Sequence, residues 1–68
     1  SEVNFVSSTI NSFGITRGAV AKVKNSRIST LSVEDYSVLY AFKSNIGMLK
    51  SINSKYYTLN SQVSKIQK

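Results

Sequence analysis

The densest group of chemically active side chains in this sequence is a short basic run. Within eleven residues that contain no acid lie Arg17, Lys22, Lys24, Asn25 and Arg27. Guanidinium and ammonium groups bind phosphates, and an asparagine amide can hydrogen-bond to a base edge. The alternative is a solvent-exposed helix end with no binding role, because cations near a helix C-terminus are also favoured by the helix dipole. The run is therefore a candidate nucleic-acid contact.

A second basic group follows in the C-terminal half, where no acid occurs after Asp35. At intervals of seven residues stand Tyr36, Lys43, Lys50 and Tyr57. On one helix they form a stripe, with lysines for phosphates and tyrosines for base stacking. The alternative is a solvated flank whose lysine stems cover the edge of an apolar seam. The candidate nucleic-acid-binding residues are Arg17, Lys22, Lys24, Asn25, Arg27, Lys43 and Lys50.

Most other site chemistry is excluded by the residue inventory. The chain has no cysteine and no histidine, which removes thiolate and imidazole metal ligands and the commonest general base. The three acids, Glu2, Glu34 and Asp35, fall where helices are expected to begin, and there they complement the helix dipole. We therefore expect no enzyme activity, no metal, no cofactor and no small-molecule substrate.

Length and composition predict one small helical domain over residues 1–68. The chain has 68 residues, a mass of 7.5 kDa, a net charge of +6 and a pI near 9.9. It contains no proline and three glycines. Because the strongest turn-forming residues are nearly missing, few turns and long helices are favoured. No repeat is convincing.

Apolar spacing predicts an all-α helical hairpin with a long second helix. Either one helix is expected over 2–25 or two shorter helices that meet near Gly14, followed by a polar loop over 25–31. A capping box at Ser32–Asp35 then begins a helix over 33–67, continuous or broken at Gly47 or 53–54. Its heptad-like, coiled-coil seam consists of Leu39, Phe42, Ile46, Leu49, Ile52, Tyr56, Leu59, Val63 and Ile66. The alternative is a compact three- or four-helix bundle.

Residues 13–27 resemble part of a phage-repressor-type helix-turn-helix. In this resemblance Gly14 forms the turn, Ile15 is the following apolar residue and Thr16 caps the recognition helix. Val20 and Val23 take its inward positions. The resemblance implies that five residues face the major groove or its phosphates: Arg17, Gly18, Ala21, Lys22 and Asn25. Ile10 departs from the pattern, because the family has a small residue at that position.

Two functions follow from these expectations. The first is a small basic DNA-binding regulator that acts as a dimer, supported by the net charge and the basic run. The alternative is a helical-hairpin assembly subunit of a filament, secretion apparatus or virion, or its chaperone, because a long seam requires a partner. Self-association is expected in both. No apolar run is long enough to span a bilayer and no secretory signal is visible, so a cytoplasmic location is favoured.

Overall fold

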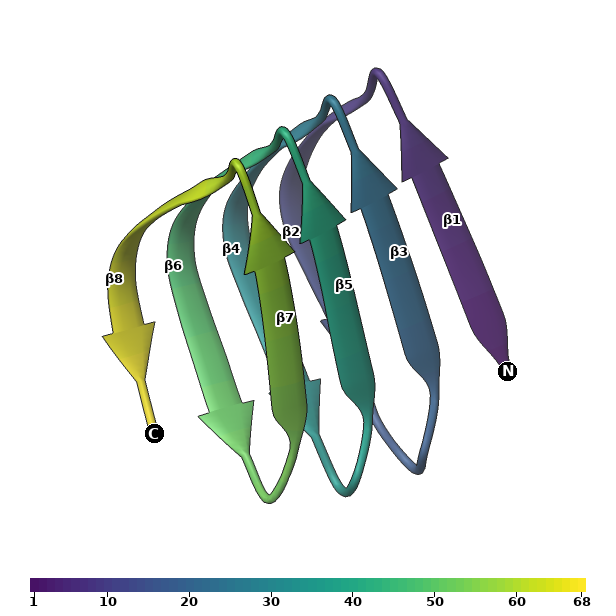
Figure 1. Cartoon of the computed structure of the whole chain (residues 1–68). Coiled ribbons are helices and arrows are strands. Elements are labelled where there is room, and N and C mark those ends of the chain that lie inside the picture. The colour runs from purple at the N-terminus through teal and green to yellow at the C-terminus, as the bar shows by residue number, and fades with distance from the viewer.

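The computed structural model describes residues 1–68, and its regular elements are all β-strands. Along the chain the strands are β1 (Glu2–Val6), β2 (Thr9–Ile15), β3 (Val20–Lys24), β4 (Arg27–Glu34), β5 (Val38–Phe42), β6 (Asn45–Ile52), β7 (Lys55–Leu59) and β8 (Gln62–Gln67). Odd-numbered strands form sheet A, in the order β1-β3-β5-β7, and even-numbered strands form sheet B, in the order β2-β4-β6-β8. Every pairing is parallel. The two sheets face each other as the walls of a β-solenoid (Figure 1).

The chain completes one coil of the solenoid in 18 residues, except between the last two coils. Val20 pairs with Val38 and Ile28 with Ile46, each 18 positions away, whereas Val38 pairs with Lys55 after 17. Parallel neighbours need a long connection between them, and here the strand of the opposite sheet provides it. The expectation that no repeat exists is therefore wrong.

The turns at one corner of the solenoid are made without glycine or proline. At this corner a residue with positive φ precedes a serine in every coil, giving the pairs Ser7–Ser8, Asn25–Ser26, Lys43–Ser44 and Asn60–Ser61. We call these four pairs the serine corner. The left-handed φ near 50° reverses the chain in a single residue. The scarcity of glycine and proline consequently did not mean few turns.

A serine ladder ties the coils together at this corner. The backbone amide of Ser8 donates to Oγ of Ser26 at 3.0 Å, Ser26 to Ser44 at 3.2 Å, and Ser44 to Ser61 at 3.1 Å. Each hydroxyl in turn donates to the carbonyl two residues before it, as Ser44 does to Phe42 at 3.0 Å. Ser26 and Ser44 are buried, so the ladder satisfies polar groups that water cannot reach.

The core lies between the sheets and is filled by stacked aliphatic side chains. The largest of these that are almost fully buried come from the two middle coils: Ile28, Leu31, Leu39, Ile46 and Leu49. Partly buried apolar residues of the end coils, such as Phe13 and Val63, pack against them. Because the two strands of one coil cannot bury an apolar face alone, each coil depends on its neighbours.

These findings correct the predicted all-α fold in both forms, the helical hairpin and the compact bundle. The segments 2–25 and 33–67 form strands and turns, and 25–31 contains the first part of β4 rather than a loop. The supposed coiled-coil seam mixes two environments, because Leu39 and Leu49 are buried while Ile52 and Leu59 are exposed. β-branched and aromatic residues suit a pleated, half-buried surface, and here they form strands.

The helix-turn-helix and the capping box are wrong for the same reason. Residues 13–27 include the end of β2, a turn and β3, so no recognition helix exists. Ser32 lies within β4, and Asp35 has a φ of 53° in the next turn, where its Oδ2 accepts a hydrogen bond from Thr16 Oγ1 at 2.9 Å. The structure contains no helix that could cross a lipid bilayer.

Candidate binding face

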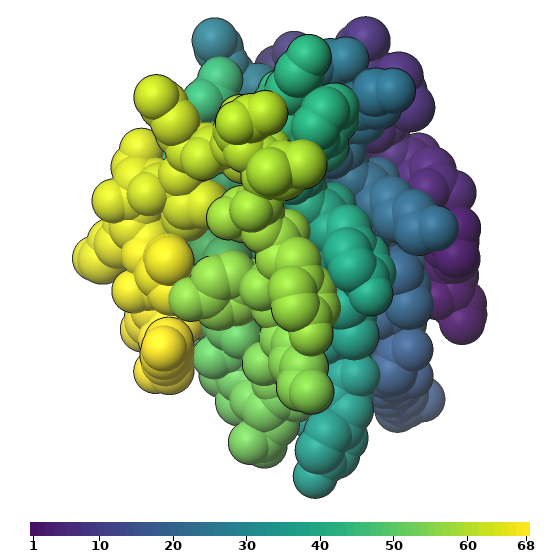
Figure 2. All heavy atoms as spheres, in the orientation of Figure 1, coloured from purple at the N-terminus to yellow at the C-terminus, as the bar shows by residue number.

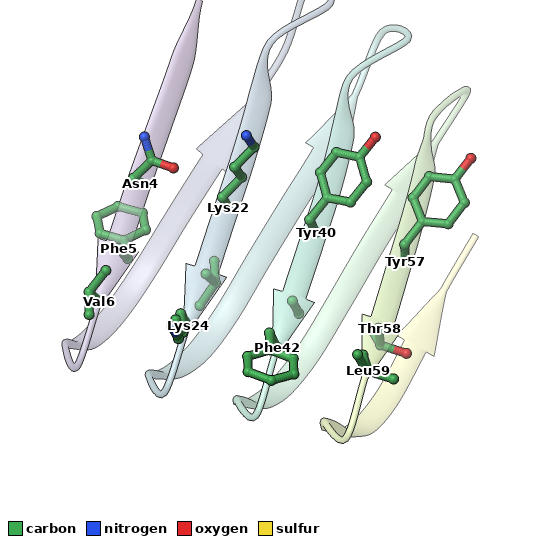
Figure 3. Close-up of a pocket in the computed structure, with 12 residues that line it drawn as sticks. Asn4, Phe5, Val6, Lys22, Lys24, Tyr40, Phe42, Tyr57, Thr58 and Leu59 are labelled. Carbon is green, nitrogen blue, oxygen red and sulfur yellow. The ribbon is translucent and has the colours of Figure 1, made fainter.

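The outer side of sheet A carries rows of side chains that run across the strands, and two of these rows lie next to the serine corner. Successive parallel strands bring every second residue to this side, and the register aligns them from coil to coil. The first row consists of Asn4, Lys22, Tyr40 and Tyr57. The second row consists of Val6, Lys24, Phe42 and Leu59 (Figure 3). We call these eight residues the sheet A face.

The aromatic part of this face lies on the last two coils. The rings of Tyr40 and Tyr57 stack at 5.3 Å between centroids and 16° between planes. Both tyrosine residues are about half exposed, at 46% and 51%. Figure 2 shows side chains of β5 and β7 projecting from this side of the molecule. Because stacking holds each ring upright against its neighbour, the tyrosines present a preformed aromatic edge.

Cations lie directly beside the aromatic residues. Nζ of Lys24 is 5.9 Å from the centroid of Phe42, and Nζ of Lys43 approaches the same ring to 5.3 Å. Lys22 forms an ion pair with Glu2 at 3.7 Å between Nζ and Oε2. Both partners of this pair are about half exposed, so water screens it and the pair contributes little to stability. The lysines therefore stay accessible to an anionic ligand.

A shallow, mainly apolar depression lies between these side chains. It has a volume of about 450 Å³ and extends over all four strands of sheet A. Val6 and Leu59 at its margins are 61% and 60% exposed. An apolar floor with ammonium groups at its sides suits a ligand that combines flat rings with negative charge.

The acids lie away from the serine corner. Glu2 lies on β1, and Glu34 and Asp35 lie where β4 ends, at the corner opposite the serines. The serine corner has Asn25, Arg27, Lys43 and Asn45 around a polar hollow. The cationic side chains of the sheet A face, Lys22 and Lys24, are consequently followed around this corner by Lys43 and Arg27.

The structure brings together some of the residues predicted as nucleic-acid contacts and separates others. Lys22 and Lys24 lie on the outer side of β3, and Lys43 lies beside Phe42. Asn25 and Arg27 follow around the serine corner. Arg17 lies in the opposite corner with a φ of 58°, and Lys50 lies on β6 in sheet B. Arg17 and Lys50 therefore do not belong to the sheet A face.

The sequence stripe at intervals of seven does not exist in space. Tyr36 lies in a turn, Lys50 in sheet B and Tyr57 in sheet A. Sequence reasoning missed five residues of the sheet A face: Asn4, Val6, Tyr40, Phe42 and Leu59. An alignment of the chain in steps of 18 residues, with a last step of 17, would have found them, since Val6, Lys24 and Phe42 are 18 positions apart and Leu59 follows after 17.

Comparison with known proteins adds no relative to this description. No family model matches the chain, and no curated protein or solved structure is significantly similar to it. The assignment of a function therefore depends on the geometry of the chain itself.

Proposed function

We propose that this protein binds single-stranded nucleic acid on the sheet A face. The observation that carries the proposal is the pair of rows that place Lys22 and Lys24 beside Tyr40, Tyr57 and Phe42 on one flat surface. Proteins that bind single strands combine cations that follow the backbone with aromatic rings on which bases stack. Both components are present here at the spacing of neighbouring strands, about 4.8 Å.

The geometry favours a single strand over a duplex. Major-groove recognition of duplex DNA uses a helix or a two-stranded ribbon that enters the groove, whereas every strand here lies in one of two four-stranded sheets. A broad parallel sheet presents a flat surface instead, and an exposed base of a single strand can stack on the face of Tyr40 or Tyr57 that the other tyrosine does not cover. The proposed role as a DNA-binding protein is kept, but the mode changes from a recognition helix to a stacking surface.

Replacing Lys22 and Lys24 with glutamine is expected to weaken the binding of a fluorescent oligothymidylate by about tenfold at about 50 mM salt. Each phosphate contact releases counterions, so the slope of log K against log salt should become shallower by about 1.4 for two contacts on a single strand. The measurement is fluorescence anisotropy over a series of salt concentrations. A parallel oligouridylate series compares DNA with RNA.

The matched control replaces Lys65 and Lys68 with glutamine, because these two lysines lie outside the sheet A face. This control removes the same charge as the test variant, and its affinity should change by less than about twofold. Equal losses of oligonucleotide affinity in the two variants would mean that binding depends on net charge alone. The sheet A face would then be excluded as the binding site. Absence of binding by the unmodified protein at low salt would also contradict the proposal.

The aromatic contribution is tested by Tyr57→Thr, which keeps a strand-forming residue in β7. Loss of one stacking platform should reduce oligonucleotide affinity by about tenfold and leave the salt slope unchanged. The control is Tyr36→Asn, since Tyr36 is 82% exposed in a turn with positive φ, a conformation that asparagine accepts. If both variants bind as well as the unmodified protein, the tyrosines do not stack on bases.

A further inference from the structure

The polar hollow at the serine corner lies between the two middle coils of the solenoid. Asn25 and Arg27 of one coil and Lys43 and Asn45 of the next lie around it, and we call it the corner hollow. It has a volume of about 280 Å³, and neither an apolar side chain nor an acid lines it. The turns of this corner lie side by side along the upper edge of the solenoid (Figure 1).

The two cations of the corner hollow have no acid beside them. The ion pair that the chain contains joins β1 to β3, and it leaves Arg27 and Lys43 without a carboxylate partner. Two positive side chains in one hollow repel each other, and a bound anion offsets this repulsion. The side-chain amides of Asn25 and Asn45 add hydrogen-bond donors to the same hollow. A guanidinium, an ammonium and amide donors together suit a phosphate group.

The corner hollow is continuous with the sheet A face through Phe42. Nζ of Lys24 lies 5.9 Å from the centroid of this ring, and Nζ of Lys43 lies 5.3 Å from it. Lys24 belongs to the sheet A face and Lys43 lines the corner hollow, so one aromatic residue adjoins both surfaces. The chain turns at Lys43 itself, with a φ of 51°, directly after Phe42. A ligand that lies on Phe42 therefore reaches the corner hollow without passing an acid.

We propose that the corner hollow binds phosphates of the same single strand whose bases stack on the sheet A face, so that the strand bends around the serine corner. This inference rests on the proposed function and adds the path and the class of its ligand. The molecule measures 25 × 23 × 21 Å, whereas duplex DNA keeps its direction over about 50 nm. A duplex resists bending around so small a body, and a flexible single strand does not. The corner hollow therefore selects single strands.

The test variant combines Arg27→Gln with Lys43→Asn, and each substitution copies a residue of another coil. Gln62 lies in the same row of sheet B as Arg27, one strand beyond their shared neighbour Asn45. Asn60 takes the place of Lys43 in its own coil and has the same φ of 51°. Because both residue types already fit these positions, the variant should keep the fold, which far-ultraviolet circular dichroism checks.

The probes are fluorescent oligothymidylates of about four and about twelve nucleotides, a range that covers common site sizes of single-strand-binding proteins. The short probe should stay on the sheet A face, where its bases stack, and its affinity should change by less than about twofold in the test variant. The long probe should bind about tenfold more weakly, with a slope of log K against log salt that is shallower by about 1.4 for two lost phosphate contacts. Fluorescence anisotropy over a salt series measures both.

The matched control is Lys65→Gln with Lys68→Gln, which removes the same two charges outside both surfaces and should change neither affinity by more than about twofold. A duplex of about twelve base pairs should lose equally little affinity in the test variant. Sodium phosphate should displace the long probe no more than sodium chloride of equal ionic strength does. Stronger displacement by phosphate would identify a site for free phosphate and overturn the inference.

Equal losses for the short and the long probe in the test variant would also overturn it, as would an unchanged affinity for the long probe. The variant Lys22→Gln with Lys24→Gln separates this failure from failure of the proposed function. If that variant weakens both probes while the test variant weakens neither, the sheet A face binds the strand and the corner hollow does not. If that variant weakens neither probe, or if the unmodified protein binds neither, both proposals are wrong.

Discussion

Replacing Leu31 with alanine is expected to lower the free energy of unfolding by about 2–5 kcal/mol. Leu31 lies on β4 with no exposed surface, and the register places Phe13 and Leu49 on either side of it. The substitution removes buried methyl groups and leaves a cavity in the middle of the stack. A domain of this size has a free energy of unfolding of only a few kcal/mol, so the variant should be largely unfolded near room temperature.

Leu59→Ala is the matched control, because it makes the same chemical change where the side chain is 60% exposed. Its expected cost is below about 0.5 kcal/mol. The measurement is urea unfolding followed by far-ultraviolet circular dichroism, at one fixed protein concentration for both variants. A helical hairpin would give the opposite order, with Leu59 in its seam and Leu31 in its loop, so a larger cost at Leu59 would contradict the solenoid.

Gly47→Ala is expected to lower the free energy of unfolding by about 2–3 kcal/mol. Gly47 lies on β6 at a point where the ladder with β4 skips one residue, between Ile46 and Met48. A Cβ at this position would lie 2.6 Å from the carbonyl oxygen of Ser29 and 3.5 Å from its Cα. The obstacle is backbone that belongs to a neighbouring strand, so the two coils would have to separate.

Gly14→Ala provides the comparison for this glycine. A Cβ at Gly14 would meet Cβ of Ser32 at 3.6 Å, which is an ordinary contact. This variant should be neutral or more stable by up to about 1 kcal/mol, because alanine restricts the unfolded chain. The same denaturation measurement applies to both variants. If both residues lay in helices, both substitutions would stabilise the protein, and that result would exclude the close approach at Gly47.

The helical prediction failed for an identifiable reason. A coil of 18 residues equals five turns of an α-helix with 3.6 residues per turn, so residues one coil apart also share a face on a helix. Ile10, Ile28 and Ile46 are in phase in both arrangements. Inward positions within a coil come two or three residues apart, as Val3, Phe5 and Ser8 illustrate. Outward apolar residues such as Val6 add to them, and the combined spacing resembles that of one face of a helix.

The candidate site was predicted in part for a related reason. Lys22, Lys24 and Lys43 were identified because their charge is visible without a fold. Phe42 was placed in the apolar seam and Tyr40 was given no role, because their partners, Lys24 and Tyr57, lie 18 and 17 positions away in the sequence. Local spacing rules cannot rank such pairs, since only parallel strand pairing makes them neighbours.

The sequence by itself determined the chemical inventory of this protein. It has excess cations, no thiol, no imidazole, and a basic C-terminal segment without acids. The tertiary structure alone decided which residues meet. Single residues in the left-handed conformation, such as Lys43 and Asn60, turn the chain at positions where the sequence has no glycine or proline. Strand pairing between residues a full coil apart then placed lysines beside aromatic rings.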